Sequence, residues 1–114
     1  MKSKDNIINF EDFRTVISGK PSKVFTGRDR GADVRNKSKI DELLVTYGTV
    51  TLVIPNDIYS ITPSFLEEFL KNAVEKYGRE ILSKVLLSAE NEYDLSEPMD
   101  EAIDRLLSTS SALN

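Results

Sequence analysis

The fold of this 114-residue chain is decided by the stretch Thr49-Val50-Thr51-Leu52-Val53-Ile54-Pro55-Asn56-Asp57. The residues before Pro55 are rich in β-branched side chains and show no helical period, which is typical of a strand buried on both faces. The Pro-Asn-Asp sequence that follows is a turn signal. The stretch therefore predicts a buried central strand that ends at a turn.

A helix is expected directly after this strand and its loop. Thr62 is a suitable N-cap residue, and Pro63 stands at the first helical position, where a missing N–H costs nothing. Gly78 ends the pattern. One face is apolar: Phe65, Leu66, Phe69, Leu70, Ala73, Val74 and Tyr77. The opposite face is polar and is expected to be solvated: Glu67, Glu68, Lys71, Asn72, Glu75 and Lys76. Glu67 and Lys71 are spaced as a favourable i, i+4 ion pair.

Working outward, short apolar segments predict strands at residues 6–10, 23–26 and 84–87. The turn signal Gly19-Lys20-Pro21-Ser22 suggests that the first two pair as a hairpin. Residues 40–47 have helical spacing, with Ser38 and Asp41 in capping-box relation and Gly48 as a stop. A last helix is expected to open at Ser96-Glu97-Pro98, with an apolar stripe of Met99, Ala102, Ile103, Leu106 and Leu107.

This order of elements predicts the fold class. Strands that alternate with helices favour parallel pairing, hence a small α/β sandwich with about four strands in a mixed, mostly parallel sheet packed by three or four helices. We expect one domain over residues 1–114, with its core at about 6–107 and a polar tail, 108–114, that frays. The charged segment 27–38 is expected to be a loop or a solvated helix.

The composition excludes several classes of function. The chain has no Cys and no His, so it has no disulfide, thiolate nucleophile or Cys zinc site, and it lacks the usual general base and the commonest metal ligand. The carboxylates of Glu67 with Glu68, and of Asp100 with Glu101 and Asp104, lie on helices and form no convincing catalytic pair. We expect no catalytic residues, no metal and no cofactor.

Charge and hydropathy address partners and location. The net charge of −4 disfavours nucleic acid as a partner. The basic residues gather between Lys20 and Lys39, while the C-terminal half is acidic. The N-terminus does not resemble a signal peptide, and the longest apolar run, Leu52-Val53-Ile54, is far shorter than a membrane span. A soluble, cytoplasmic protein without a membrane partner is expected.

The loop at residues 55–64 is the first candidate site, because ligands and modifications of α/β units gather between a strand's carboxyl end and the next helix. Three hydroxyl groups, of Ser60, Thr62 and Ser64, approach the positive end of the helix dipole there, beside Tyr59. A phosphate on Ser64 would be favoured by that dipole. The alternative is that Thr62 and Ser64 are ordinary capping residues.

Three arginines form the second candidate site. Arg28, Arg30 and Arg35 flank Gly31, but the segment lacks the patterns of phosphate-binding glycine loops. Their guanidinium groups are suited to an anion or to the carboxylates of a partner. The alternative is a solvated face on which Asp29 and Asp33 form local ion pairs with them.

Two motifs resemble a known family. Phe25-Thr26-Gly27-Arg28-Asp29-Arg30-Gly31-Ala32-Asp33-Val34-Arg35 and Ser60-Ile61-Thr62-Pro63-Ser64-Phe65-Leu66-Glu67-Glu68-Phe69 are similar to the uncharacterised bacterial STAS-like domains. Those domains resemble anti-sigma factor antagonists and the cytosolic domain of sulfate transporters. The matching positions are Arg28, Gly31, Arg35, Ser64, Phe65, Leu66, Glu67 and Glu68. The antagonists have Asp and Ser where this chain has Thr62 and Pro63.

The resemblance implies a non-enzymatic switch. In anti-sigma factor antagonists, a serine at this helix start is phosphorylated by the kinase that is also the binding partner, and Ser64 aligns with it. We therefore expect a regulatory interaction module whose partner is a histidine-kinase-like ATPase or an anti-sigma-like kinase, with Ser64 as the phosphorylation candidate ahead of Thr62 and Ser60. The expected docking residues are Asn56, Asp57, Tyr59, Thr62, Ser64, Glu67, Glu68 and Lys71.

Other functions remain open at this point. The first is a small-anion or nucleotide sensor that uses Arg28 and Arg35 with the helix start at Ser64. The second is an enzyme relying on Tyr59, Ser64 and a Lys or Glu, which no spacing supports. A partner protein of a mobile element or defence system, and a homodimer, are further alternatives.

Overall fold

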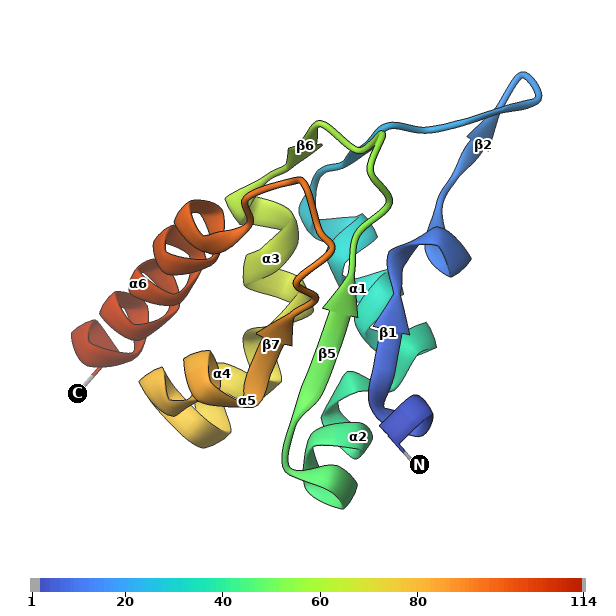
Figure 1. Cartoon of the computed structure of the whole chain (residues 1–114). Coiled ribbons are helices and arrows are strands. Elements are labelled where there is room, and N and C mark those ends of the chain that lie inside the picture. Colours follow the sequence, from blue (N-terminus) through green and yellow to red (C-terminus); the bar gives the residue numbers. More distant parts are fainter. Residues whose placement is uncertain (1–2, 114) are drawn as a thin grey trace.

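The computed structural model describes residues 3–113, which form a mixed α/β structure around a three-stranded parallel sheet (Figure 1). The sheet has the order β1 (Ile7–Asn9), β5 (Val50–Val53), β7 (Val85–Leu87). Ile7 is level with Thr51, and Thr51 is level with Leu86. The expected central strand is confirmed, since β5 lies between the other two. The α/β class is confirmed as well, although this sheet has three strands where about four were expected.

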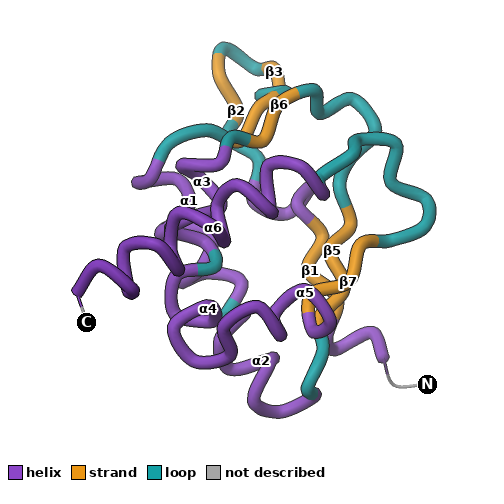
Figure 2. The backbone as a smooth tube through the Cα atoms, turned by 90° about the vertical axis from the view of Figure 1, so that its left-hand side faces the viewer, coloured by secondary structure: helices purple, strands orange, loops and turns teal. Residues whose placement is uncertain are grey.

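The helices lie to one side of this sheet (Figure 2). They are α1 (Arg28–Ser38), α2 (Ile40–Tyr47), α3 (Pro63–Phe69), α4 (Lys71–Tyr77), α5 (Ile81–Lys84) and α6 (Ser96–Leu113). Short 3-10 turns are η1 (Ser3–Asn6), η2 (Phe10–Phe13) and η3 (Gly78–Glu80). Alternation along the strands directs Ile8, Val50, Leu52 and Val85 into the core. Four buried phenylalanines pack ring against ring between the layers: Phe10, Phe25, Phe65 and Phe69.

Two small strand pairs stand apart from the main sheet. β2 (Val16–Ile17) and β3 (Lys20–Pro21) form an antiparallel hairpin, while β4 (Val24–Phe25) and β6 (Ser60–Ile61) pair in parallel. The predicted hairpin between residues 6–10 and 23–26 is therefore wrong. Each of those strands pairs instead with a strand that comes later in the chain. The turn between them belongs to the hairpin β2–β3, where Ser18 and Gly19 have positive φ angles of 53° and 80°.

The predicted helix over 63–77 is broken in the middle. Leu70 has φ −100° and ψ 3°, so its backbone leaves the helical region and separates α3 from α4. The break lies between Glu67 and Lys71, the residues expected to pair at i, i+4. The predicted start of α2 is also wrong in detail: Lys39 in the left-handed conformation takes the N-cap position, and no side chain caps the helix. The stop at Gly48 is confirmed by its φ of 81°.

The charged segment 27–38 is the helix α1, one of the two expected outcomes. It is not wholly solvated, because Gly31 and Val34 are buried. At the other end of the chain, α6 continues to Leu113, through the segment expected to fray, and Asn114 lies outside the described residues. None of the helices in the described range is long and apolar enough to cross a membrane.

Candidate functional site

The two motifs of the sequence meet where α1 crosses α3. Arg28, Gly31 and Arg35 are spaced i, i+3 and i+7, so they lie on one face of α1. Gly31 is at the crossing itself: a Cβ atom there would lie 2.1 Å from the backbone oxygen of Phe65. A glycine is therefore required for the two helices to approach this closely.

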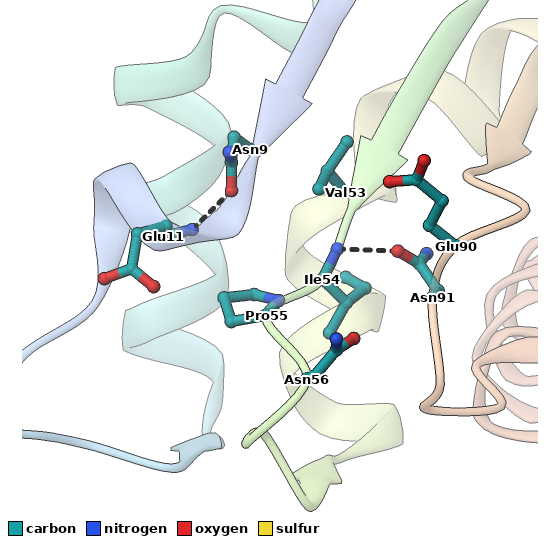
Figure 3. A pocket seen from close by; sticks show the side chains of 8 residues that line it. All are labelled: Asn9, Glu11, Val53, Ile54, Pro55, Asn56, Glu90 and Asn91. Atoms are coloured by element: carbon teal, nitrogen blue, oxygen red, sulfur yellow. Dashed lines mark hydrogen bonds between the residues drawn. The ribbon is translucent and has the colours of Figure 1, made fainter.

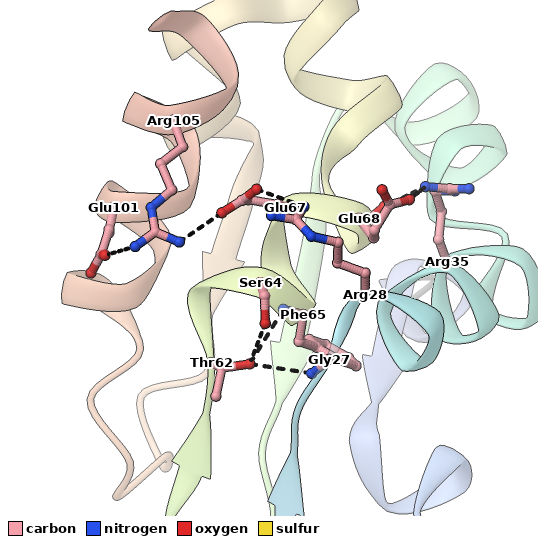
Figure 4. A network of polar contacts seen from close by, with 10 residues as sticks. All are labelled: Gly27, Arg28, Arg35, Thr62, Ser64, Phe65, Glu67, Glu68, Glu101 and Arg105. Carbon is pink, nitrogen blue, oxygen red and sulfur yellow. Dashed lines mark hydrogen bonds and ion pairs between the residues drawn. The ribbon is translucent and has the colours of Figure 1, made fainter. Parts of the chain in front are cut away.

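On either side of Gly31, an arginine of α1 binds a glutamate of α3 (Figure 4). Arg28 Nη1 donates to Glu67 Oε1 at 2.8 Å, and Arg35 Nη1 lies 3.3 Å from Glu68 Oε1. Arg35 also donates to the backbone oxygen of Glu68. The consecutive glutamates thus each hold a different arginine, which fixes the position of α3 on α1.

Glu67 joins a third helix to this crossing. Its second oxygen, Oε2, accepts a hydrogen bond from Arg105 Nη1 on α6 at 2.9 Å, and Arg105 also binds Glu101 one turn away. The carboxylate is therefore held between α1 and α6 (Figure 4). We call Arg28, Glu67 and Arg105 the clamp.

The solvated position expected for Glu67 is wrong, because the residue is 6% exposed. Burial alone would raise the pKa of its carboxyl group, but hydrogen bonds from Arg105 and Arg28 outweigh that effect and hold the pKa below its usual range. A buried carboxylate whose two oxygens both accept hydrogen bonds from arginines of the same chain is not available to a docking partner. Glu68 is half-buried, and Lys71 is exposed, as a docking residue must be.

The start of α3 has the cap expected from the sequence. Thr62 Oγ1 accepts a hydrogen bond from the Phe65 backbone N–H at 3.3 Å and from that of Gly27 at 3.4 Å. It also lies 3.1 Å from Ser64 Oγ (Figure 4). Thr62 is thus confirmed as the N-cap, and its hydroxyl links the start of α1 to the start of α3. Ser64 is half-buried beside it, and Ser60 lies in β6.

The loop between β5 and β6 is anchored through Asp57 and the Tyr59 backbone, and the side chains of Asn56 and Tyr59 are exposed. Both carboxylate oxygens of Asp57 accept hydrogen bonds from Arg14, at 3.0 and 2.8 Å, and this pairing lowers the pKa of Asp57. The Tyr59 backbone N–H donates to the Lys23 carbonyl at 2.9 Å, while its side chain is 70% exposed. Asn56 is also exposed. The side chains of Asn56 and Tyr59 are therefore exposed to solvent, and their role in docking stays a prediction.

The three arginines of the anion-binding hypothesis all contact acceptors of their own chain. Arg28 and Arg35 hold Glu67 and Glu68, while Arg30 binds Asp33 at 2.9 Å and stacks over the Phe25 ring. An anion would have to displace these partners. The local ion pair between Arg30 and Asp33 is the one that the alternative interpretation anticipated.

A pocket of about 280 Å³ lies at the carboxyl edge of the sheet, the usual position for ligands in α/β proteins (Figure 3). Its lining consists of Asn9, Glu11, Val53, Ile54, Pro55, Asn56, Glu90 and Asn91. Asn91 accepts from the Ile54 backbone N–H at 3.0 Å and donates to the Leu52 carbonyl at 3.2 Å. Asn9 accepts from the backbone N–H of Glu11. The side-chain amides of Asn9 and Asn91 thus bind backbone groups at the ends of β1 and β5.

Among the described residues, no group of three or more acidic side chains is arranged to hold a metal ion. Comparisons with protein families, curated proteins and solved structures found no match to this chain. The resemblance to STAS-like domains is tested by none of these comparisons and stays a prediction from the two motifs quoted above.

Sequence reasoning missed two arginines that organise this region, Arg14 and Arg105. Arg105 had a local signal, since it follows Glu101 by four residues on the predicted last helix. Arg14 stands between two predicted strands, and its ion pair with Glu11 is local, but its partners Ser22 and Asp57 are fixed by tertiary structure, so its anchoring role had no signal in the sequence.

Proposed function

We propose that this chain is a non-enzymatic, regulatory protein-interaction module, with Ser64 as its phosphorylation switch and a histidine-kinase-like ATPase as its partner. The observation that carries the proposal is the position of Ser64 at the capped start of α3, one turn before the clamp residue Glu67. Tyr59, 70% exposed, precedes Ser64 in the chain, and Arg28, whose side chain is 57% exposed, binds Glu67 one turn after Ser64.

The clamp supplies a physical route from modification to binding. Residues at i and i+3 share one face of a helix, so a phosphate on Ser64 would be placed next to the carboxylate of Glu67. It would add nearly two negative charges at pH 7 and compete with Glu67 for Arg28, the partner on α1. Phosphorylation would thereby change both the charge of the docking surface and the hold of α1 on α3.

The docking residues that remain for a partner are exposed or half-buried. They are Asn56, Asp57, Tyr59, Thr62, Ser64, Glu68 and Lys71. This set contains one basic and two acidic side chains around an exposed aromatic ring, a composition suited to a polar interface with one anchor residue.

The test is capture of the partner from the native host by the tagged chain, with mass spectrometry of Ser64. The unmodified protein is expected to retain the ATPase, and Ser64→Asp is expected to lose it by at least about tenfold, which corresponds to 1.4 kcal/mol. Ser83→Asp is the matched control, because Ser83 is an exposed serine on α5. Equal retention by the two variants, or the absence of both phosphate and complex, would contradict the proposal.

A further inference from the structure

An exposed apolar arm, formed by residues early in the chain, projects from the molecule. The hairpin β2–β3, residues 16–21, extends away from the helices and the main sheet (Figure 1). Its apolar residues Val16 and Ile17 are 64% and 63% exposed. A two-stranded hairpin without a core is at best marginally stable in water, so this arm would be stabilised by packing against another surface. We call residues 16–21 the arm.

The base of the arm is held firmly in contrast to its tip. The Arg14 side chain is 5% exposed, and its Nε and Nη2 atoms donate to the Ser22 carbonyl at 3.0 and 2.9 Å. The same guanidinium group binds both carboxylate oxygens of Asp57. The Ser22 backbone N–H donates to the Thr15 carbonyl at 2.7 Å. The fold thus presents Val16 and Ile17 in a defined direction.

A groove of complementary character lies along β7. It has a volume of about 310 Å³ and is lined by Leu82, Val85, Leu86, Leu87, Ser96, Met99 and Asp100. Leu82, Leu86 and Leu87 are 42%, 43% and 37% exposed. In the described sheet, β7 pairs with β5 on one side and forms the edge on the other. An edge strand with exposed leucines is a template for the addition of another strand.

We propose that the arm of one copy of this chain docks along β7 in the groove of a second copy. Val16 and Ile17 would contact the exposed leucines of the groove. The charges agree with this pairing, because the arm and its base carry Lys20 and Lys23, whereas Glu97 and Asp100 stand at the start of α6 beside the groove. The occupant is a second copy because each chain supplies both complementary surfaces. The association is independent of Ser64.

The strands β2 and β7 lie on different parts of the molecule (Figure 1), so the arm and the groove that lines β7 are different surfaces. A contact between unlike surfaces either continues from copy to copy or closes as a pair in which each arm enters the other groove. Both arrangements place residue 17 of one chain against residue 86 of another, which is a specific and measurable proximity.

The absence of cysteine from the sequence allows a direct test of that proximity. Ile17→Cys and Leu86→Cys proteins are prepared separately, mixed and oxidised, and the products are resolved by non-reducing electrophoresis. A covalent dimer is expected in the mixture and not from either variant alone. Val45→Cys mixed with Leu86→Cys is the control, since Val45 is also 64% exposed but lies on α2. A mixture that cross-links no faster than this control would overturn the proposal, as would equal cross-linking by Ile17→Cys alone.

The mass in solution gives a second, independent measurement. Light scattering at increasing protein concentration is expected to show masses above the 12.8 kDa of one chain. The double variant Val16→Ser, Ile17→Ser is expected to associate at least about tenfold more weakly while its circular dichroism is unchanged. A wild-type chain that stays monomeric up to millimolar concentration, or a double variant that associates equally well, would overturn the proposal. A monomer would indicate that the arm serves a different protein.

Discussion

The crossing of α1 and α3 and the hairpin arm both depend on arginine–carboxylate pairs, but they bury opposite partners. At the crossing, Glu67 is 6% exposed and its arginine partners are half exposed. At the base of the arm, the Arg14 side chain is 5% exposed and Asp57 is 48% exposed. The first arrangement fixes helices to one another, and the second fixes a loop and a hairpin that face solvent.

The difference teaches how to interpret a charged motif. The Arg28–Gly31–Arg35 pattern predicted a binding site for an anion or a partner, yet its arginines bind carboxylates of the same chain. The arm carries no charged motif of that kind, yet it exposes two neighbouring apolar side chains, whose exposure to water does not stabilise a monomer. In this fold, the conspicuous arginines bind carboxylates of the same chain, and the surface that we propose for contact with a second copy is the exposed apolar arm.

The largest expected effect comes from a methyl group at the crossing. Gly31→Ala is expected to destabilise the fold by about 4 kcal/mol, because its Cβ would lie 2.1 Å from the Phe65 oxygen and the helices must move apart. Gly19→Ala in the arm meets no atom within 4 Å and is expected to cost about 1 kcal/mol for its positive φ. Urea unfolding measures both. Equal losses would contradict the close helix contact.

Removal of the buried charge is expected to have the next largest effect. Glu67→Gln leaves Arg28 and Arg105 without their shared carboxylate and is expected to cost about 2 kcal/mol, because charge-assisted hydrogen bonds are lost while the half-exposed arginines can still be solvated. Glu75→Gln, at an exposed position of α4, is the control and should change the unfolding free energy by less than about 0.5 kcal/mol. A Glu67→Gln variant as stable as the control would show that the clamp contributes nothing.

Acid should remove the same contribution. The pKa of Glu67 is lower in the folded chain than in the unfolded chain, so the unfolded state binds more protons at pH values between the two pKa values. The free energy of unfolding therefore decreases as the pH is lowered through this range. We expect the clamp's contribution to be complete above about pH 4.3 and to be lost on further acidification. The measurement is the difference in unfolding free energy between wild type and Glu67→Gln, at neutral pH and at acid pH. A difference that does not narrow in acid would contradict the assignment.

The smallest effect on stability is expected in the arm. Replacement of Val16 and Ile17 by Ser should alter the unfolding free energy of the monomer by less than about 0.5 kcal/mol, because both side chains are exposed. Thermal unfolding in dilute solution measures this. A large loss would show that the arm contributes to the core and is not a contact surface.

The sequence predicted the elements with local signals and missed those fixed by distant contacts. The β-branched run at β5, the Thr62 cap and the stop at Gly48 all follow from neighbouring residues, and each is confirmed. The pairing of β4 with β6 joins Phe25 to Ile61 across 36 positions of the chain, so no local pattern could predict it.

In the candidate site, too, the features with local signals were predictable and those that depend on distant contacts were not. The cap at the start of α3 was predictable, but the burial of Glu67 was not. On a regular helix Glu67 lies among polar neighbours, and the arrival of Arg105 from α6 gives its carboxylate a buried partner. The role of Gly31 was equally hidden, because it depends on the position of the Phe65 carbonyl on another helix.

The side chain of Asn91 has a consequence for motion as well as for structure. Its amide acts as an additional strand residue, since it receives the Ile54 N–H at 3.0 Å and donates to the Leu52 carbonyl, which the Ser88 N–H also reaches. Exchange of the Ile54 amide hydrogen with deuterated solvent therefore requires this hydrogen bond to the Asn91 side chain to open. The exchange rate of that one amide, measured by nuclear magnetic resonance, therefore reports how often the Asn91 side chain releases it, while the amides of β5 stay protected.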